Sequence, residues 1–134
     1  MEMEKNIETP QGGFLIRPYR DSDEEKVIAL WETAFGRKLD RKVWRWKFHE
    51  CPFGRRVMLC LSEAGDPVCM YSGIPYPSVW EGRDIRLTQL IDNMSHPGHR
   101  QAVNGRKGLF TLTGEAFFSV YGQDPDSDIF YGFP

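Results

Sequence analysis

The stretch of sequence that decides the fold covers residues 90–110 and reads LIDNMSHPGHRQAVNGRKGLF. It begins as an apolar strand that ends at Pro97, and its second half enters a helix through the turn GRKG at 105–108. The first amides of a helix have no partner within the helix, and the helix dipole adds partial positive charge at the same end. With two glycines and two basic side chains beside those amides, the turn predicts a binding site for a phosphate or a pyrophosphate. An ordinary surface turn is the alternative interpretation.

The elements next to this stretch follow from hydrophobic spacing. A helix is predicted to begin at Gly105 or Arg106 and to end at Gly122, because apolar residues recur between them at helical spacing. A last strand is predicted over residues 128–133. On the upstream side, a hairpin turn at residues 80–83 leads into a strand over residues 85–94.

The N-terminal part predicts a strand and a helix. Residues 14–17 form a short β-type run that Pro18 ends, because proline cannot donate a ladder hydrogen bond. The helix is predicted to open at Asp21, with Glu24 as its capping-box partner, and to close at Gly36.

The middle of the chain predicts a second helix and two more strands. Asp40 is expected to cap the helix and Pro52 to end it, and the strands are expected over residues 56–62 and 67–78. The second strand contains three residues that bend or bulge a strand, namely Gly73, Pro75 and Pro77. The predicted order is β-α-α-β-β-β-α-β, so the expected fold class is α+β (mixed α/β) with a mostly antiparallel sheet.

Composition places the chain among ordinary globular domains. Its 134 residues predict a single domain over residues 14–134, preceded by a polar, flexible lead-in over residues 1–13. A net charge of −2 gives no general attraction to nucleic acid or to an anionic membrane, and no apolar run is long enough to span a bilayer. Three cysteines without a paired framework favour reduced thiols and a cytoplasmic location.

Four segments, taken together, resemble the GNAT superfamily of N-acetyltransferases. Residues 92–100 and 105–111 are similar to the family's His-Pro-x-x-Arg stretch and to the glycine-containing turn that wraps the pyrophosphate of CoA. Residues 16–19 resemble the family's opening strand and helix start. Residues 44–48 and 131–134 resemble a helix and a strand of a subgroup that includes the enhanced-intracellular-survival-type acetyltransferases.

This resemblance implies an acyl-CoA-binding domain in which a primary amine attacks the thioester of acetyl-CoA directly. It implies that backbone groups of the strand before the turn bind the pantetheine arm, and that the turn binds the pyrophosphate. The residues implied for acetyl-CoA are Met94, Ser95, Gly105, Arg106, Lys107, Gly108 and Leu109. Asp92 is the candidate for the base that deprotonates the amine, and a surface or capping carboxylate is its alternative interpretation.

The sequence departs from the family pattern in two places. In the family the turn follows the motif arginine at once, whereas here residues 101–105 follow Arg100 first. Either Arg100 is the motif arginine, displaced by an insertion, or Gly105 takes its place. The chain also stops after the family's fifth strand, which implies a partial GNAT fold that holds the N-terminal part only. A non-catalytic acyl-CoA-binding or interaction module is therefore the first alternative function.

A second alternative comes from residues 37–56, which carry eight basic and two acidic residues with aromatic residues between them. Basic charge combined with stacking rings is typical of proteins that bind single-stranded nucleic acid. The simpler interpretation is an amphipathic helix with its apolar face on the sheet and its basic face in solvent.

The histidines and cysteines predict neither a metal site nor a reactive thiol. His96 and His99, together with cysteines at 51, 60 and 69, lack the spacing of zinc ligands, so no metal site is predicted. Cys60 and Cys69 fall in apolar strand patterns, which predicts buried and unreactive thiols.

The C-terminal segment 128–134 predicts self-association. Phe130, Tyr131 and Phe133 would leave an apolar edge if the last strand were unpaired. Proteins usually cover or pair such an edge, so a second copy or an exchanged strand is expected to bind there.

Overall fold

The computed structural model describes residues 3–100, 102–104, 107–123 and 129–133. The elements in chain order are β1 (Lys5–Thr9), β2 (Gly12–Pro18), the 3-10 turn η1 (Asp21–Asp23), α1 (Glu24–Phe35), α2 (Arg41–Phe48), β3 (Arg56–Ser62), β4 (Pro67–Trp80), β5 (Arg83–Leu90), β6 (Met94–Ser95), the 3-10 turn η2 (Pro97–His99), β7 (Ala102–Asn104), β8 (Lys107–Gly108), α3 (Leu109–Tyr121) and β9 (Ile129–Tyr131). This is the mixed α+β fold that the sequence predicts.

One mostly antiparallel sheet organises the chain. Its strands follow the order β1-β2-β3-β4-β5-β9, and β6 pairs with β4 beyond the end of β5. Each pair in this sheet is antiparallel except β5 with β9, which is parallel. The short strands β7 and β8 form a separate antiparallel pair just before α3.

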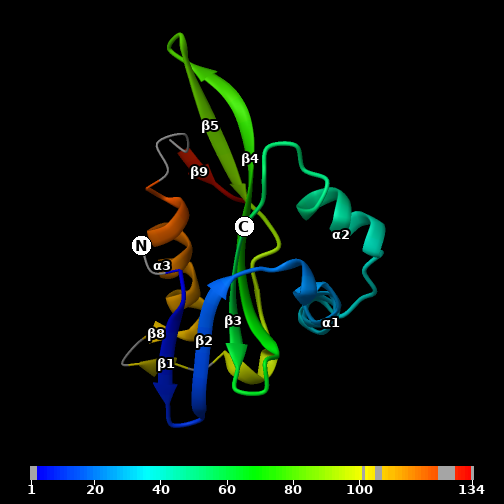
Figure 1. Cartoon of the computed structure of the whole chain (residues 1–134), viewed down its shortest axis with the longest axis vertical. Helices are drawn as coiled ribbons and strands as arrows, with labels where there is room; N and C mark the ends of the chain where they lie inside the picture. The colour runs from blue at the N-terminus through cyan, green and yellow to red at the C-terminus, as the bar shows by residue number, and fades with distance from the viewer. Residues whose placement is uncertain (1–2, 101, 105–106, 124–128, 134) are drawn as a thin grey trace.

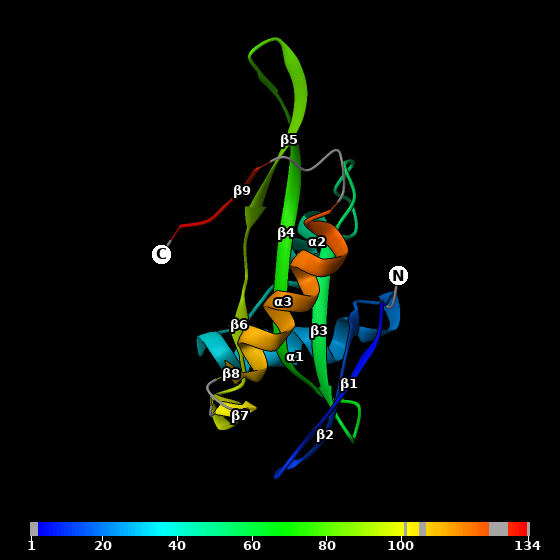
Figure 2. The same cartoon turned by 90° about the vertical axis from the view of Figure 1, so that its left-hand side faces the viewer.

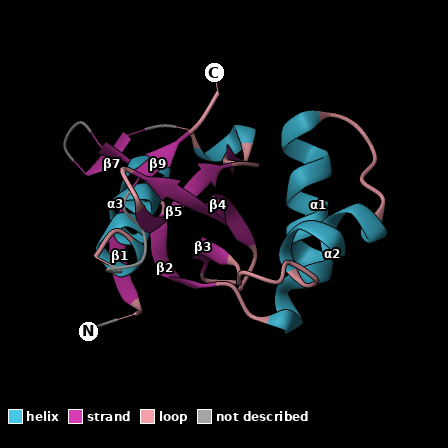
Figure 3. Ribbon diagram, turned by 90° about the horizontal axis from the view of Figure 1, so that it is seen from above, coloured by secondary structure: helices cyan, strands magenta, loops and turns pink. Residues whose placement is uncertain are grey.

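Helices cover both faces of the sheet. Helices α1 and α2 lie on one face and α3 lies on the other (Figure 1 and Figure 3). Strand β3 reads RVMLCLS and is apolar almost throughout, which is typical of a strand covered on both sides. Its alternate residues Val57, Leu59 and Leu61 pack toward α1 and α2, whereas Met58 and Cys60 pack toward α3.

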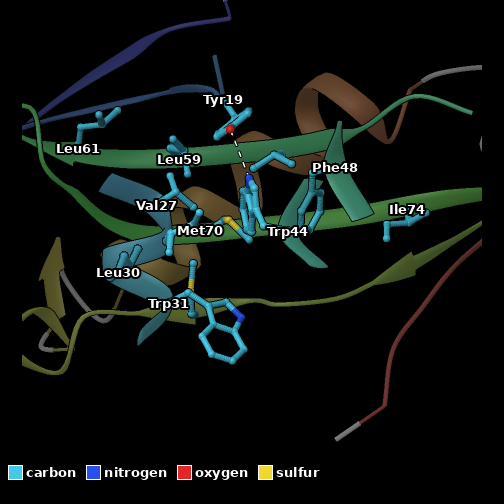
Figure 4. Packing of buried hydrophobic residues seen from close by; sticks show 13 residues of the cluster. Tyr19, Val27, Leu30, Trp31, Trp44, Phe48, Leu59, Leu61, Met70 and Ile74 are labelled. Atoms are coloured by element: carbon cyan, nitrogen blue, oxygen red, sulfur yellow. Dashed lines mark hydrogen bonds between the residues drawn. The ribbon is translucent and has the colours of Figure 1, made fainter. Parts of the chain in front are cut away.

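The core beneath α1 and α2 is built around aromatic side chains. Trp44 and Phe48 from α2 are buried against Leu59 and Met70 of the sheet (Figure 4). The indole nitrogen of Trp44 lies 3.4 Å from the hydroxyl oxygen of Tyr19 and donates to it (Figure 4). The predicted apolar face of this helix on the sheet is therefore confirmed.

The prolines of β4 lie in its two-stranded part. Strand β3 pairs with β4 only as far as Gly73, whereas β5 continues to pair up to Trp80. In the described part of the chain, Pro75 and Pro77 thus lie where β4 pairs with β5 alone, and proline is tolerated in such edge positions. This part of the β4–β5 hairpin extends beyond the rest of the sheet (Figure 1).

The N-terminal segment is more ordered than its polarity predicts. Residues 5–9, expected within a flexible lead-in, form β1 and pair with β2. Gly12 makes the connecting turn at a φ of 115°, a conformation that suits glycine, and the hydroxyl of Thr9 donates to the Gly12 carbonyl at 2.8 Å. One apolar residue, Ile7, is buried against the α3 side, and backbone pairing supplies the remaining contacts.

The start of α1 differs from the predicted capping box. Residues 21–23 form the 3-10 turn, and the acid that accepts a hydrogen bond from the amide of Arg20 is Asp23, at 2.8 Å. Glu24 instead accepts two hydrogen bonds from Arg45 of α2. The predicted caps at Gly36 and Asp40 are confirmed, but α2 ends at Phe48, four residues before Pro52.

Two predicted elements beside the turn are also revised. The strand expected over residues 85–94 is interrupted at 91–93, between β5 and β6. The helix expected from Gly105 or Arg106 begins at Leu109, because Lys107 and Gly108 pair with β7. Gly105 and Arg106 themselves lie outside the described residues.

The last strand and the turn between β4 and β5 are both close to the predicted ones. Within the predicted 128–133, residues 129–131 form β9, and Asp128 lies outside the described residues. Strand β9 pairs with β5 and is the last strand in the order of the sheet, so among the described strands its other side remains an edge. At the β4–β5 turn, Glu81 and Gly82 both have positive φ, as the expected two-residue hairpin turn requires.

Asp23→Asn is expected to weaken the fold in a pH-dependent way. The Asp23 carboxylate accepts two hydrogen bonds of 2.8 Å from Arg17, and both side chains are about nine-tenths buried. Burial alone would raise the pKa of Asp23, but the hydrogen bonds from Arg17 and from the Arg20 amide, with the charges of both arginines, together lower it below its ordinary 3.8. The stability from this lowered pKa is therefore present above pH 4 or so and is lost as the pH falls through the folded-state pKa.

Urea unfolding between pH 7 and pH 2.5 checks this prediction. At pH 7 the variant should lose about 3–5 kcal/mol, because it leaves the buried Arg17 cation without its partner, and its stability should fall less steeply on acidification than that of the wild type. Asp66→Asn is the control, because Asp66 pairs with Lys26 at the surface, where such pairs contribute little. Equal pH slopes for the wild type and Asp23→Asn would contradict the assignment.

Candidate functional site

The sheet is interrupted at one point along the edge of β4. Strand β5 leaves β4 after Leu90, and β6 rejoins it at Met94, so residues 91–93 bridge the two. Asp92 has a φ of 56° in this segment, in the left-handed region that aspartate adopts more readily than most residues do. The chain therefore turns its backbone away from regular pairing here.

Ser72 of β4 fixes both ends of the interruption. Its carbonyl oxygen accepts from the amide of Ile91 at 3.1 Å, and its hydroxyl donates to the carbonyl oxygen of Ile91. Its amide donates to the side-chain oxygen of Asn93 at 2.8 Å. These contacts replace the ladder hydrogen bonds that regular strand pairing would have provided.

The side chain of Asp92 connects the interruption to both helices of the adjacent face. One carboxylate oxygen lies 2.9 Å from the ammonium nitrogen of Lys47 in α2, and the other accepts from the indole nitrogen of Trp31 in α1 at 3.4 Å. The Lys47 and Asp92 side chains are only 18% and 12% exposed. This is a largely buried ion pair, so the interruption has a defined shape.

Strand β9 diverges from the sheet beside the interruption. It pairs with β5 from Leu87 to Gln89 and has no pairing with β6, and the end of the chain leads away from β6 in Figure 2. A pocket of about 580 Å³ lies at this divergence on the α1 side. Its lining residues are Phe35, Leu90, Ile91, Asp92, Asn93, Gly132 and Phe133.

A second pocket lies on the α3 side of the sheet. Its volume is about 520 Å³, and its lining residues are Tyr71, Phe110, Thr111, Gly114, Glu115 and Phe118. Gly114 lets α3 approach the sheet, because a β-carbon at that position would lie 3.0 Å from the Tyr71 ring. The two faces of the sheet therefore each have a pocket, and the one on the α1 side lies where β9 departs.

The residues predicted for the co-substrate have different surroundings. Met94 is buried in the core under α1, and the carbonyl oxygen of Ser95 accepts from the Arg100 guanidinium at 3.1 Å. The ammonium nitrogen of Lys107 lies 2.6 Å from a carboxylate oxygen of Glu115, a residue in the second turn of α3. Gly108 is the N-cap residue of α3 and adds no side chain over the first helical amides.

The other three residues predicted for the co-substrate are Leu109, Gly105 and Arg106. Leu109 is the first residue of α3 and is buried, so its role in the fold is packing, and its backbone contributes to the helix start. Gly105 and Arg106 lie outside the described residues. The structure thus brings Gly108 and Leu109 to the start of α3, and Met94, Ser95 and Asp92 to the neighbouring β6 and the interruption.

The sequence alone did not identify Lys47, Trp31, Phe35 or Phe133 as part of this region. Lys47 and Trp31 are 45 and 61 residues from Asp92 in the chain, so no local spacing connects them. In the sequence, Lys47 fits an amphipathic helix as a solvated lysine, and Trp31 fits one as a core tryptophan. Only packing of α1 and α2 against the sheet brings them to Asp92.

The basic segment 37–56 is largely paired within the chain. Arg45 binds Glu24 through two hydrogen bonds, Arg41 binds Glu25, and Arg55 binds Asp21. Of the rings in this segment, Trp44 and Phe48 are buried and are not available for stacking on bases. These contacts favour the amphipathic-helix interpretation over a nucleic-acid site.

Cys60 and Cys69 are poor nucleophiles in this environment. Burial raises the pKa of the Cys60 thiol to about 12, and burial also raises the pKa of Cys69. In the described part of the chain, no group of three or more histidine, cysteine, aspartate or glutamate side chains is arranged to hold a metal ion. Over the same residues, no helix has the length and apolar character needed to cross a membrane.

The fold and the interruption define a class of domain: a mixed sheet that opens between two neighbouring strands, with a helix starting beside the opening. The family model described as an acetyltransferase (GNAT) domain matches residues 15–117. That match covers more than half of the chain, so the chain belongs to the GNAT acetyltransferase family. No curated protein sequence matches the chain.

Solved structures of low identity share the fold. A GCN5-related glucosamine N-acetyltransferase region of a fungal multi-domain GH3 β-N-acetylglucosaminidase is 19% identical with a TM-score of 0.67, and the match covers 90% of this chain and 13% of that one. Glucosamine-6-phosphate N-acetyltransferase from Arabidopsis thaliana is 13% identical with a TM-score of 0.67, over 90% of this chain and 82% of that one. The aminoglycoside acetyltransferase AAC(6')-Iy, in complex with a CoA-containing bisubstrate analogue, is 12% identical with a TM-score of 0.66, over 90% and 79%.

Lys47→Met is expected to destabilise the protein by about 1–3 kcal/mol, because it leaves the largely buried Asp92 carboxylate without its cation. Lys47→Arg should retain most of the stability, since a guanidinium can donate to the same oxygen. Chemical denaturation measures both, and Lys42→Met is the control, because Lys42 is an exposed lysine on the same helix. A loss for Lys47→Met no larger than that for Lys42→Met would contradict the role of this ion pair.

Proposed function

We propose that this chain is an N-acetyltransferase domain that binds acetyl-CoA and transfers its acetyl group to a primary amine. The observation that carries the proposal is the opening between β6 and β9, beside the start of α3. In a closed sheet no small molecule could pass between two strands, whereas here one opening on the α3 side and one on the α1 side are available for two substrates. Family membership supports the same chemistry.

The α3 side suits the CoA moiety. The first amides of a 13-residue helix have no partners in the helix and carry the positive end of its dipole. Gly108 leaves those amides uncovered by a side chain, and we propose that they bind the pyrophosphate together with the backbone of Gly105, Arg106, Lys107 and Leu109. The backbone of Met94 and Ser95 would bind the pantetheine arm along β6.

The α1 side suits the acceptor. The amine nitrogen would attack the thioester carbonyl carbon in the opening, forming a carbon–nitrogen bond as the carbon–sulfur bond breaks. Backbone amides of the interrupted strand would stabilise the negative charge on the carbonyl oxygen. The ammonium form of the acceptor must first lose a proton, and the departing thiolate must gain one.

Asp92 as the base stays a prediction. It is the one carboxylate among the residues that line the α1-side pocket. Both of its oxygens already accept hydrogen bonds, from Lys47 and Trp31, so it can receive a proton only through a water molecule or after one of these bonds opens. The same observation favours the alternative of a non-catalytic acyl-CoA-binding module.

The remaining parts of the proposal concern subgroup, location and assembly. We propose that the chain belongs to the subgroup of enhanced-intracellular-survival-type acetyltransferases, which the likeness of residues 44–48 and 131–134 supports. We also propose a cytoplasmic location and self-association through residues 128–134. Among the described strands β9 is at the edge of the sheet, which supports the latter.

Gly108→Glu is expected to weaken acetyl-CoA binding by more than about tenfold, because it puts bulk and negative charge at the N-cap of the helix that would bind the pyrophosphate. Isothermal titration calorimetry measures the affinity. Ser119→Glu is the control, since it adds the same charge on an exposed site of the same helix, more than two turns away. Unchanged affinity in a folded Gly108→Glu protein would remove the assignment.

Asp92→Asn separates the enzyme from the binding module. If Asp92 is the base, the variant should bind acetyl-CoA normally and lower kcat by about 10²–10⁴-fold. An unchanged kcat with a lower unfolding free energy would instead identify Asp92 as a structural residue. If the wild type binds acetyl-CoA but acetylates no amine above background, the enzyme proposal fails and the binding module stands.

A further inference from the structure

The α1-side pocket has an apolar part and a polar part. Four of its seven lining residues are apolar, and two of them are aromatic rings with free surface, Phe35 at 44% exposed and Phe133 at 77% exposed. Phe35 ends α1, and its ring packs against Trp31 with centroids 4.8 Å apart, so one face of the pocket has a fixed position. The volume of about 580 Å³ is in the range of small-molecule sites.

The polar residues of this pocket are already bound to the protein. The Asp92 carboxylate is paired with the Lys47 ammonium at 2.9 Å, so the pair as a whole is neutral. The side-chain oxygen of Asn93 accepts from the Ser72 amide. Among the lining residues that the structure describes, there is no lysine or arginine and no second carboxylate.

These contacts bear on the charge that an acceptor can carry. A polycationic acceptor requires several carboxylates, since each ammonium group taken from water needs a charged or hydrogen-bonding partner. A phosphorylated acceptor requires a cation or a cluster of amide donors. An apolar body needs only surface to bury, and that is what the lining residues offer.

We propose that the acceptor is a primary monoamine attached to an uncharged, apolar body about the size of one aromatic ring. This inference rests on the proposed function and names its substrate class. The body would stack on Phe35 and contact Phe133, and its amine would lie near the Asp92 end of the pocket. The reaction joins the amine nitrogen to the acetyl carbon, releases CoA as a thiol and releases one proton from the ammonium group.

The first experiment compares three acceptors with acetyl-CoA and the whole chain. They are 2-phenylethylamine, glucosamine 6-phosphate and a polycationic aminoglycoside, and CoA thiol release gives kcat/KM for each. We expect 2-phenylethylamine to exceed the other two by about tenfold or more, because only its body matches the lining of the pocket. A preference for the aminoglycoside or the phosphorylated sugar overturns the inference and leaves the proposed function intact.

A matched pair of variants tests the pocket itself. Phe35→Ala should raise KM for 2-phenylethylamine by about tenfold and leave acetyl-CoA affinity unchanged, since it removes the ring that the substrate would cover. Phe53→Ala is the control, because Phe53 is similarly exposed, at 42%, but does not line the pocket. Phe35→Leu keeps the apolar contact with Trp31 and guards against a change in folding, and it should give an intermediate KM.

The remaining outcomes are also decisive. Equal KM values for Phe35→Ala and Phe53→Ala overturn the inference, even if 2-phenylethylamine is the preferred acceptor. If no amine is acetylated while calorimetry detects acetyl-CoA binding, the transferase proposal and this inference both fail. If acetyl-CoA does not bind at all, the co-substrate assignment fails as well, so the two failures can be told apart.

Discussion

The contact between Asp92 and its two partners, Lys47 and Trp31, connects the one irregular point of the edge beside β4 to both helices of the adjacent face. A strand that leaves its neighbour exposes backbone groups, and it keeps that shape only if other contacts replace the lost ladder bonds. Ser72 supplies those contacts from the sheet, and Asp92 supplies them from the helices. The contacts that shape the opening of the sheet therefore also connect it to α1 and α2.

Each face of the sheet has a pocket of its own, one on the α1 side and one on the α3 side. The start of α3 gives one face a helix N-terminus whose N-cap residue, Gly108, has no side chain, whereas α1 gives the other face an aromatic wall through Phe35. In the proposed reaction, a thioester between β6 and β9 would meet the acceptor on the α1 side.

Charge within the domain is used mainly for packing. Arg45 with Glu24 and Lys47 with Asp92 join elements that are distant in the chain, whereas Arg17 with Asp23 joins β2 to the turn that follows it. The only carboxylate among the described residues of the α1-side pocket, Asp92, is one of these paired groups. The basic segment 37–56, whose sequence suggests nucleic-acid binding, thus forms ion pairs that hold α2 against neighbouring elements.

The sequence by itself determined the class of fold, the caps at Gly36 and Asp40 and the apolar face of α2, because these depend on local spacing and on backbone preferences of single residues. It did not reveal the interruption at residues 91–93, since two polar residues, Asp92 and Asn93, also fit the end of a strand and their spacing does not encode the positive φ of Asp92. Nor did it reveal β1, whose polar residues are held by backbone pairing. The ion pair of Lys47 with Asp92 and the aromatic pocket were decided by tertiary structure alone, because residues far apart in the chain meet only when the helices pack on the sheet.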